Sequence, residues 1–251
     1  MNRFLVAFCC SLVIIHVTDN VEGKLPPSIK VCSRNDRNLA DCIIRSVKYL
    51  QPSLVDGNLG PGLRLPPVEP FLLSAVNIGR GNDFKGLFTN LLIRGASKFR
   101  IEKMRANIND LRFDFIINFA NLDIRGKYDL VFKLFGFSLK GRGDIIGNFQ
   151  NVRAKVTMRG RKYQKNGQTY LQFEKFQIKI QPVNLKNLQL TNLFQGNKAL
   201  EEIGNAFING NSDFFLSDVY PGIENNLSDL FTSIANQIMS EATFDELFPN
   251  T

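Results

Sequence analysis

Between residues 71 and 191, apolar and polar side chains alternate with a period of two, and this alternation constrains the fold more than any other feature. It is clearest between residues 120 and 135. There Leu122, Ile124, Tyr128 and Leu130 share one parity, while charged or amide side chains hold the other. Such a pattern is typical of a β-strand with one buried and one solvent-facing side.

The same alternation recurs in neighbouring segments, at residues 111–119, 137–149, 152–158 and 170–180. The Asn166-Gly167 pair before the last of these segments predicts a hairpin turn. The apolar parity slips by one residue between Phe173 and Phe176, and again between Ile101 and Met104. Such slips predict β-bulges, which bend strands. The segments together predict one strongly curled antiparallel sheet.

After about residue 195 the apolar period becomes helical. Asn197 is expected to cap a first helix, and Ser212 to begin a second that is kinked or restarted at Pro221. The apolar stripe of the first helix is Leu200, Ile203 and Phe207, and that of the second is Ile223, Leu227, Leu230, Phe231, Ile234 and Ile238. The sheet needs cover on its apolar face. We therefore predict an α+β fold in which a highly curved antiparallel sheet wraps the long C-terminal helix. No linker divides residues 24–251, which are expected to form a single domain.

Residues 1–23 are predicted to be a secretory signal peptide. A short start with one positive charge precedes an apolar run from Phe4 to Val17, which is too short to span a bilayer but suits a signal-peptide core. The alternative, a buried N-terminal strand or helix, fits the abrupt onset of charge after this run less well. The mature chain has no second apolar run of 18 residues and is expected to be secreted and extracellular.

Two cysteines lie beyond the predicted cleavage site, Cys32 and Cys42. In an oxidising compartment a pair this close predicts one disulfide, worth roughly 2–3 kcal/mol on the chain-entropy model. Asp36 is expected to cap a short helix that ends at Pro52 and carries Cys42. The disulfide would staple this N-terminal helix to the extended segment before it.

Cleavage after Gly23 also removes the only histidine, His16. That excludes Ser-His-Asp and Cys-His catalysis, histidine-ligated metals and imidazole pH switches from the mature chain. The sequence also lacks a nucleophile elbow, a phosphate-binding loop and a dinucleotide fingerprint. Carboxylates on the polar parity lie among Arg and Lys, which favours solvated ion pairs. We therefore expect no catalytic residues, no metal, no cofactor and no enzymatic activity.

Loss of Arg3, Asp19 and Glu22 with the signal peptide leaves 30 basic and 21 acidic residues, a net charge of +9. Six of the basic residues cluster along one predicted hairpin: Arg153, Lys155, Arg159, Arg161, Lys162 and Lys165. A hairpin solvated on its polar face is the simplest interpretation. The functional alternative is docking on an anionic membrane or a glycosaminoglycan, including transient membrane or receptor contact. Nucleic acid is not an expected partner of a secreted chain, and the oligomeric state is left open.

Phenylalanine provides the strongest positive signal, since the chain has 22 Phe and no Trp. Many of them fall on the inward parity of the predicted strands, where they supply large apolar area without a polar group. Core packing explains each one singly, but as a set around a central helix they are expected to line an elongated apolar tunnel. The candidate ligand-binding residues are Phe113, Phe115, Leu130, Phe132, Phe137, Phe173, Phe176 and Phe231.

Asn226 begins the single N-glycosylation sequon, Asn226-Leu-Ser228. It is a candidate glycosylation site, although it falls in the middle of the predicted long helix. Its occupancy is therefore left open.

Four segments, in this order, resemble the takeout / juvenile-hormone-binding-protein family of secreted insect carriers. They are the Cys32 to Cys42 loop, residues 62–71 (Gly-Leu-Arg-Leu-Pro-Pro-Val-Glu-Pro-Phe), residues 192–200 and the terminal segment 244–248. Glu69 stands where the family usually has Asp. Because juvenile-hormone binders typically carry a second disulfide in the sheet region, which this chain cannot form, the resemblance is nearer to the takeout branch.

The resemblance implies the tubular lipid-binding fold, in which a long helix is wrapped by a curved sheet around an internal tunnel. It implies a secreted carrier of a small hydrophobic ligand such as a terpenoid, a fatty acid or another lipid. Takeout-like proteins are associated with circadian, feeding and chemosensory physiology. The alternative function is a surface-interaction protein that docks through the basic hairpin.

Overall fold

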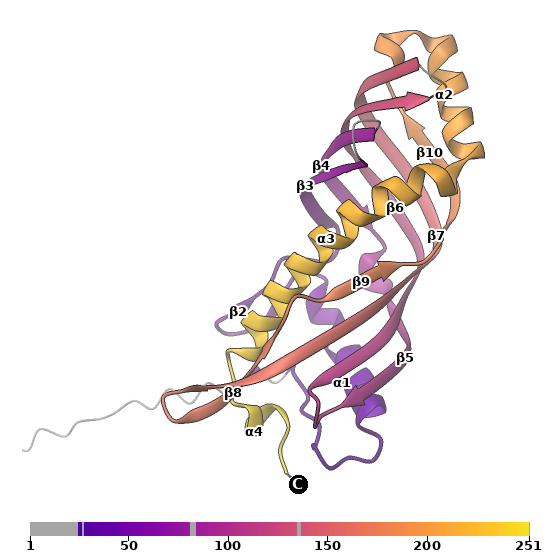
Figure 1. Cartoon of the computed structure of the whole chain (residues 1–251). Coiled ribbons are helices and arrows are strands. Elements are labelled where there is room, and N and C mark those ends of the chain that lie inside the picture. Colours follow the sequence, from indigo (N-terminus) through magenta and orange to yellow (C-terminus); the bar gives the residue numbers. More distant parts are fainter. Residues whose placement is uncertain (1–24, 27, 81–83, 135–136, 251) are drawn as a thin grey trace, which may run out of the picture.

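The computed structural model describes residues 25–26, 28–80, 84–134 and 137–250, so the predicted signal peptide, residues 1–23, lies outside the described residues. The chain forms a strongly curled antiparallel sheet with helices along its open side (Figure 1). Its helices are α1 (Leu39–Leu54), α2 (Lys198–Gly210), α3 (Ser212–Met239) and α4 (Phe244–Leu247), with short 3-10 turns η1 (Ala96–Lys98) and η2 (Phe194–Gly196). Its strands are β1 (Asn58–Gly60), β2 (Leu63–Arg64), β3 (Phe71–Arg80), β4 (Phe84–Arg94), β5 (Arg100–Asn107), β6 (Arg112–Leu134), β7 (Phe137–Lys165), β8 (Gln168–Phe173), β9 (Gln177–Ile180) and β10 (Asn184–Leu190).

Strands β6 and β7 form the spine of the sheet. They are 23 and 29 residues long, and they stay in one antiparallel register from the Arg112–Arg159 pair to the Leu134–Phe137 pair. On one side, β6 pairs with β5 and then with β4, which pairs with β3. On the other side, β7 pairs in turn with β10, β9 and β8. The shorter strands thus extend the central pair on both flanks.

Helix α3 runs along the concave side of this sheet for most of its length (Figure 1). Helix α2 lies at one end of the elongated molecule, and α1, α4 and the β7–β8 hairpin lie at the other. On the side of α3 away from the spine, α1 and the β1–β2 hairpin add a small cluster built on Leu59, Leu63 and Leu65. None of the described helices is both long and apolar enough to cross a bilayer.

The predicted segments do form strands, but there are fewer strands than predicted segments, because some neighbouring segments join into one long strand. Residues 111–119 and 120–135 fall in one strand, and so do 137–149 and 152–158. The buried parity changes within β6 near Asn118, while Asn151 on β7 takes a φ of +51°. A register shift between Ile101 and Lys103 confirms the predicted bulge before Met104. Between Phe173 and Phe176 the chain also slips by one residue, because Phe173 lies opposite Gly160 but Gln177 lies opposite Thr157, and residues 174–176 interrupt the strand there.

The helix prediction needs three corrections. Helix α1 begins at Leu39 rather than beside Asp36, whose carboxylate accepts the Asn38 N–H at 2.7 Å, and it continues through Pro52. Helix α3 does not restart at Pro221 but contains it, because buried side chains on both sides of the proline hold the helix against the sheet. Asn197 caps α2 as expected, but the apolar stripe of α2 faces outward, with Ile203 65% exposed.

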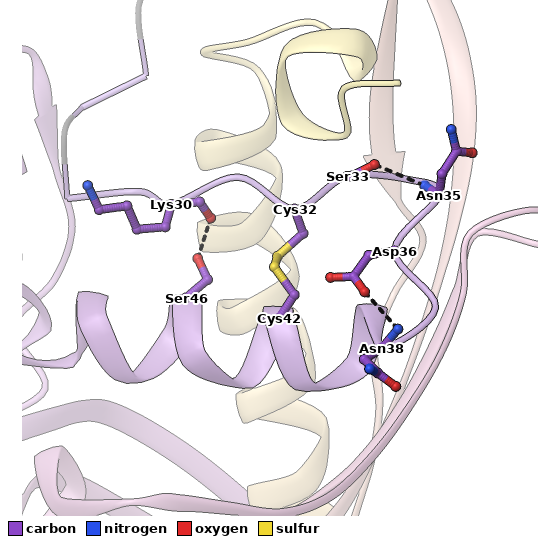
Figure 2. The surroundings of a disulfide bond; sticks show 8 residues. All are labelled: Lys30, Cys32, Ser33, Asn35, Asp36, Asn38, Cys42 and Ser46. Carbon is purple, nitrogen blue, oxygen red and sulfur yellow. Dashed lines mark hydrogen bonds between the residues drawn. A yellow bond between two sulfur atoms is a disulfide. The ribbon is translucent and has the colours of Figure 1, made fainter. Parts of the chain in front are cut away.

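The N-terminal segment is tied to α1 by the predicted disulfide. Cys32 and Cys42 are joined with their Cα atoms 5.9 Å apart (Figure 2). The Ser46 hydroxyl on the same helix donates to the Lys30 carbonyl, so the segment is held at a second point one turn further along. The short N-terminal helix is therefore fixed to the chain that precedes it.

Candidate functional site: the apolar interior along α3

The interior between α3 and the sheet holds two apolar clusters. We call the first the α2-end cluster; it includes Val76, Phe84, Leu130, Leu190, Ile208 and Phe215. We call the second the α4-end cluster; it includes Leu111, Phe113, Val156, Phe173, Phe176 and Phe244. Each combines inward residues of strands with residues of helices, as a curled sheet around a helix requires.

Leu227 and Phe231 of α3 connect the two clusters, because each packs against both. The Phe231 ring also stacks on the Phe71 ring of β3, with centroids 5.8 Å apart and planes 9° apart. The two clusters therefore form one continuous apolar interior that follows α3.

Several apolar side chains that pack against the α4-end cluster keep accessible surface. From the sheet these are Met104, Phe115, Ile117 and Met158, and from α3 they are Ala235 and Met239. The α4-end cluster therefore keeps accessible apolar surface at its margin.

The structure divides the predicted ligand-binding residues between the clusters. Leu130 is fully buried in the α2-end cluster, whereas Phe113, Phe173 and Phe176 are buried in the α4-end cluster. Their rings contact one another, with the Phe173 centroid 5.9 Å from Phe113 and 5.7 Å from Phe176. Phe115 is partly buried beside them, and Phe231 joins the clusters. The side chains of Phe132 and Phe137 lie outside the described residues.

Polar side chains of α3 form hydrogen bonds with backbone groups at the free edge of the sheet. The sequence pattern did not predict this role. Asn236 Oδ1 accepts the Phe173 N–H at 2.7 Å, and Asn236 Nδ2 donates to the Phe173 carbonyl at 2.9 Å. Thr232 Oγ1 accepts the Phe176 N–H, and Glu224 Oε1 accepts the Ile180 N–H. These bonds satisfy backbone groups that β7 leaves unpaired, and they seal α3 to β8 and β9.

Helix α2 bonds β10 in the same way. Asn209 exchanges a pair of hydrogen bonds with the backbone of Leu188, and Asn205 does so with Leu190, at distances of 2.6 to 2.9 Å. The only sequence signal for these contacts is the spacing of four between Asn205 and Asn209, which places both on one helix face. A solvent-facing helix side would show the same spacing.

The opposite seam, between α3 and β3, is closed by direct packing. A Cβ atom on Gly222 would lie 2.3 Å from the Asn77 carbonyl oxygen, so only glycine allows α3 to approach β3 this closely. Phe71 of β3 stacks on Phe231 further along the same seam. One seam is therefore polar and hydrogen-bonded, and the other is tightly packed.

Tyr220 supplies a polar group in this apolar environment. It packs against the α2-end cluster, and its buried hydroxyl has no acceptor for its proton among the described residues. Burial raises the pKa of Tyr220, and the neighbouring backbone N–H of Val183 offsets only part of that effect. An unsatisfied buried donor of this kind is costly unless a further group bonds it.

The α4 end of the interior is closed by the C-terminal segment. Phe244 and Phe248 pack on the aromatic rings of the α4-end cluster, with Phe248 6.3 Å from Phe113 between centroids. Arg34, next to the disulfide, donates to the Phe248 carbonyl at 2.7 Å and pairs with Asp245. The stapled N-terminal loop therefore holds the C-terminal segment in place.

The predicted basic cluster lies on β7, but not all on one face. Arg153, Lys155, Arg159 and Arg161 alternate with buried or inward residues and point away from α3. Lys165 shares their parity. Lys162 has the opposite parity and lies 3.9 Å from the centroid of the Phe244 ring, which corrects the expectation of a single polar face.

Asn226 lies in the middle of α3 and is half-buried. Its Nδ2 donates to the Gly222 carbonyl at 2.9 Å, and Ser228 is only 4% exposed. The sequon is therefore embedded in the helix that covers the sheet.

Two open pockets lie on the outer surface. One, of about 400 Å³, lies between α2 and β10, and the other, of about 540 Å³, lies between residues 34–41 and 105–109. Both are lined largely by charged and amide side chains, so neither suits an apolar molecule as well as the interior does.

Comparison with known proteins agrees with this architecture. Residues 4–249 match the family described as haemolymph juvenile hormone binding protein. The chain belongs to this family.

The haemolymph juvenile hormone binding protein family includes relatives with low identity and high coverage. The chain is 22% identical to the circadian clock-controlled protein daywake of Drosophila melanogaster over 241 residues, which are 92% of this chain and 90% of that protein. It is also 22% identical to daywake of Drosophila yakuba over 246 residues, 94% and 92% of the two chains. The crystal structure of Epiphyas postvittana Takeout 1 superimposes with a TM-score of 0.72 at 16% identity and covers 88% of this chain and 100% of that one. The fold of this chain is therefore that of Takeout 1.

Segments that carry the resemblance to the haemolymph juvenile hormone binding protein family have structural roles here. Glu69, in the segment 62–71, accepts hydrogen bonds from Gly95 and Ser97 and so fastens the start of β3 to the turn after β4. Residues 192–200 form η2 and the capped start of α2, and residues 244–248 form α4 and close the interior. The family motifs thus lie at the ends and corners of the apolar interior.

Proposed function

We propose that this protein is a carrier that binds one small apolar ligand in the interior along α3. The observation that carries the proposal is the junction at Leu227 and Phe231, which makes the two apolar clusters continuous. Partly exposed apolar side chains beside the α4-end cluster, which Leu227 and Phe231 also contact, offer surface that a ligand would cover. Membership of a family described as juvenile hormone binding supports the same function.

The ligand class follows from the polarity of the interior. Apolar side chains from both clusters suit a chain or ring hydrocarbon, as in a terpenoid or a fatty acid. The hydroxyl proton of Tyr220, which has no acceptor among the described residues, favours a ligand with an acceptor oxygen, such as a carboxylate, an ester or an alcohol. An elongated molecule with one oxygenated end satisfies both conditions.

Secretion and physiology belong to the same proposal. The predicted signal peptide and the Cys32–Cys42 disulfide fit an extracellular carrier. The similarity to daywake, a circadian clock-controlled protein, supports a link to circadian physiology, which a time course of this protein's transcript over a light–dark cycle would test.

The first experiment is mass spectrometry of an organic extract of the protein, secreted by a eukaryotic host, beside native mass spectra of the same sample. We expect one apolar molecule in near-stoichiometric amount. Phe231→Asp should lose it, whereas Phe214→Asp, on the same helix at a residue that is 56% exposed, should retain it.

A second variant keeps the test informative if Phe231→Asp does not fold. Ala235→Phe adds apolar volume next to the junction without adding a charge, and we expect it to displace the ligand. An empty wild-type protein whose melting temperature is unchanged by palmitic acid or by farnesol would overturn the proposal.

A further inference from the structure

A row of cations runs along the outward face of β7, on the side of the sheet away from α3. Its members are Arg153, Lys155, Arg159, Arg161 and Lys165, all exposed and all of one parity. Ala154 and Val156, of the opposite parity, are buried in the α4-end cluster. At the rise of a β-strand the row is about 40 Å long.

Toward the hairpin tip, the positive charge of the row is largely not balanced by nearby carboxylates. Residues 145–173 contain six Arg or Lys and no Asp or Glu. Arg153 pairs with Glu102, but among the described residues Arg159, Arg161 and Lys165 have no carboxylate partner, and Arg161 donates instead to Gln172 at 2.9 Å.

The neighbouring strands add positive charge beside the row. Lys155 lies opposite Lys179 of β9, and Arg159 lies opposite Arg112 of β6. The carboxylates there are engaged: Glu224 pairs with Lys179, and Asp114 accepts from Arg112 at 2.8 Å and from Thr157 at 2.6 Å. The bond from Arg112 is the main reason that the pKa of Asp114 lies below its ordinary value.

The shape of this surface favours a linear partner over a flat one. Figure 1 shows β7 continuing as one long strand into its hairpin with β8, so the row presents a narrow line of charge rather than a broad patch. The tip of the hairpin carries Gln164, Asn166 and Gln168, all exposed, and the nearest aromatic side chains, Tyr163 and Tyr170, pack on each other with their centroids 5.7 Å apart. The hairpin projects past the end of α3, which leaves the row open to a long chain.

We propose that the outward face of β7 and its hairpin with β8 binds a linear sulfated polysaccharide. Arginine predominates in the row, and its planar fork of N–H donors matches sulfate oxygens in pairs. Thr157, which is buried, and Tyr163 interrupt the row, so a flexible polyanion would contact it in three places, at Arg153 and Lys155, at Arg159 and Arg161, and at Lys165. This function is separate from the carrier function, because the row and the interior lie on opposite faces of the sheet.

Elution from immobilised heparin across a series of salt concentrations, with titration of soluble heparin, tests the proposal. The variant Arg159→Gln/Arg161→Gln/Lys165→Gln removes three cations of the row. The matched control Lys85→Gln/Lys186→Gln/Lys198→Gln removes three exposed cations from β4, β10 and α2. Circular dichroism and the melting temperature confirm that both variants are folded.

We expect the row variant to elute at much lower salt than the wild type. Because each bound cation releases about one counterion from a polyanion, the slope of log K against log salt should fall by about two to three. The control variant should keep most of the wild-type slope. Equal losses in the two variants would show that net charge alone is responsible and would overturn the proposal.

Phosphatidylcholine vesicles with and without phosphatidylserine test whether the row binds an anionic membrane instead of a polysaccharide. We expect weak binding to both, measured by co-sedimentation at 0.15 M salt. Strong, row-dependent binding to the phosphatidylserine vesicles together with weak binding to heparin would overturn the polysaccharide assignment in favour of a membrane. Ligand extraction from the row variant should be unchanged, so failure of this proposal and failure of the carrier proposal are distinguishable.

Discussion

The carboxylate of Glu69 accepts a hydrogen bond from the Ser97 hydroxyl at 2.8 Å. It also accepts the backbone N–H groups of Gly95 at 3.0 Å and Ser97 at 3.2 Å, and so holds a turn in which Gly95 has a φ of +90°. Burial alone raises the pKa of Glu69. The hydrogen bonds and the charge of Lys98 outweigh it and hold that pKa below its ordinary value.

Glu69→Gln should therefore lower the free energy of unfolding by about 2 kcal/mol at pH 7, since it weakens several charge-assisted hydrogen bonds. A lowered native pKa stabilises the fold above the unfolded pKa of about 4.3, and this contribution is lost as pH falls through the native pKa. Urea unfolding at pH 7 and pH 3 should show the difference between wild type and variant shrinking. A difference that stays constant, or an equal effect of Glu202→Gln at an exposed site, would contradict this explanation.

Asn236→Ala should destabilise the seam between α3 and β8. It leaves the N–H and the carbonyl of Phe173 without their partner, at a cost of about 2–3 kcal/mol. Hydrogen exchange should quicken most at the amides of Phe173 and Phe176. Ser233→Ala, at an exposed position on the same helix, serves as the control and should change neither quantity.

Arg34→Ala should release the C-terminal segment locally. The variant loses the bond to the Phe248 carbonyl and the pair with Asp245, but the disulfide and the sheet are untouched. We expect faster hydrogen exchange and proteolysis within residues 243–250 at an almost unchanged melting temperature. Arg37→Ala, at an exposed neighbouring position, is the control. Equal exchange in the two variants would show that Arg34 does not hold α4.

Tyr220→Phe should separate oxygenated ligands from hydrocarbons. Within the described part of the chain this buried hydroxyl lacks an acceptor, so its removal should stabilise the delipidated protein by about 1 kcal/mol. The same change should weaken binding of a fatty acid about five- to tenfold in a calorimetric titration, while a hydrocarbon of equal length keeps its affinity. Equal effects on both ligands would place the polar end of the ligand elsewhere.

Asn226 should carry no glycan in the folded protein. Its Nδ2 is bonded within α3, and the Ser228 hydroxyl of the sequon donates to the Glu224 carbonyl at 2.6 Å. The intact mass of the secreted protein should not change on treatment with an N-glycosidase. Gln168→Thr creates a sequon at Asn166 on the exposed hairpin tip and provides a positive control, which should lose mass on the same treatment.

Sequence patterns predict the strands well because side-chain parity reports directly which face of a strand is buried. They predict the start of α2 as well, since Asn197 accepts the Leu200 N–H at 3.1 Å as an N-cap should. They fail where a polar residue has a tertiary partner: Asn205, Asn209 and Asn236 look like a solvated helix face until the edge strands lie beside them. The apolar spacing of α2 also fails to predict that Ile203 lies on the outward side of the helix.

Sequence patterns are limited in the same way for the candidate ligand-binding residues. Parity selects these residues but does not predict which of them contact one another. Phe113, Phe115, Phe173 and Phe176 gather in or beside the α4-end cluster, whereas Leu130 belongs to the α2-end cluster. The residues that join the two regions, Leu227 and Phe231, come from a helix, and only packing reveals their position. Parity can therefore define an interior but not its continuity.

The unbroken register between β6 and β7 limits how the protein can accommodate ligands of different size. A sheet whose central pair has no slip along 23 residues behaves as a stiff shell and cannot widen by sliding. The edge facing β8 and β9 is bonded, and Gly222 already touches β3. Space for a bulkier ligand must therefore come from side-chain rearrangement at the flexible methionines Met104, Met158 and Met239. Such a carrier would discriminate between ligands by their cross-section but tolerate differences in their length.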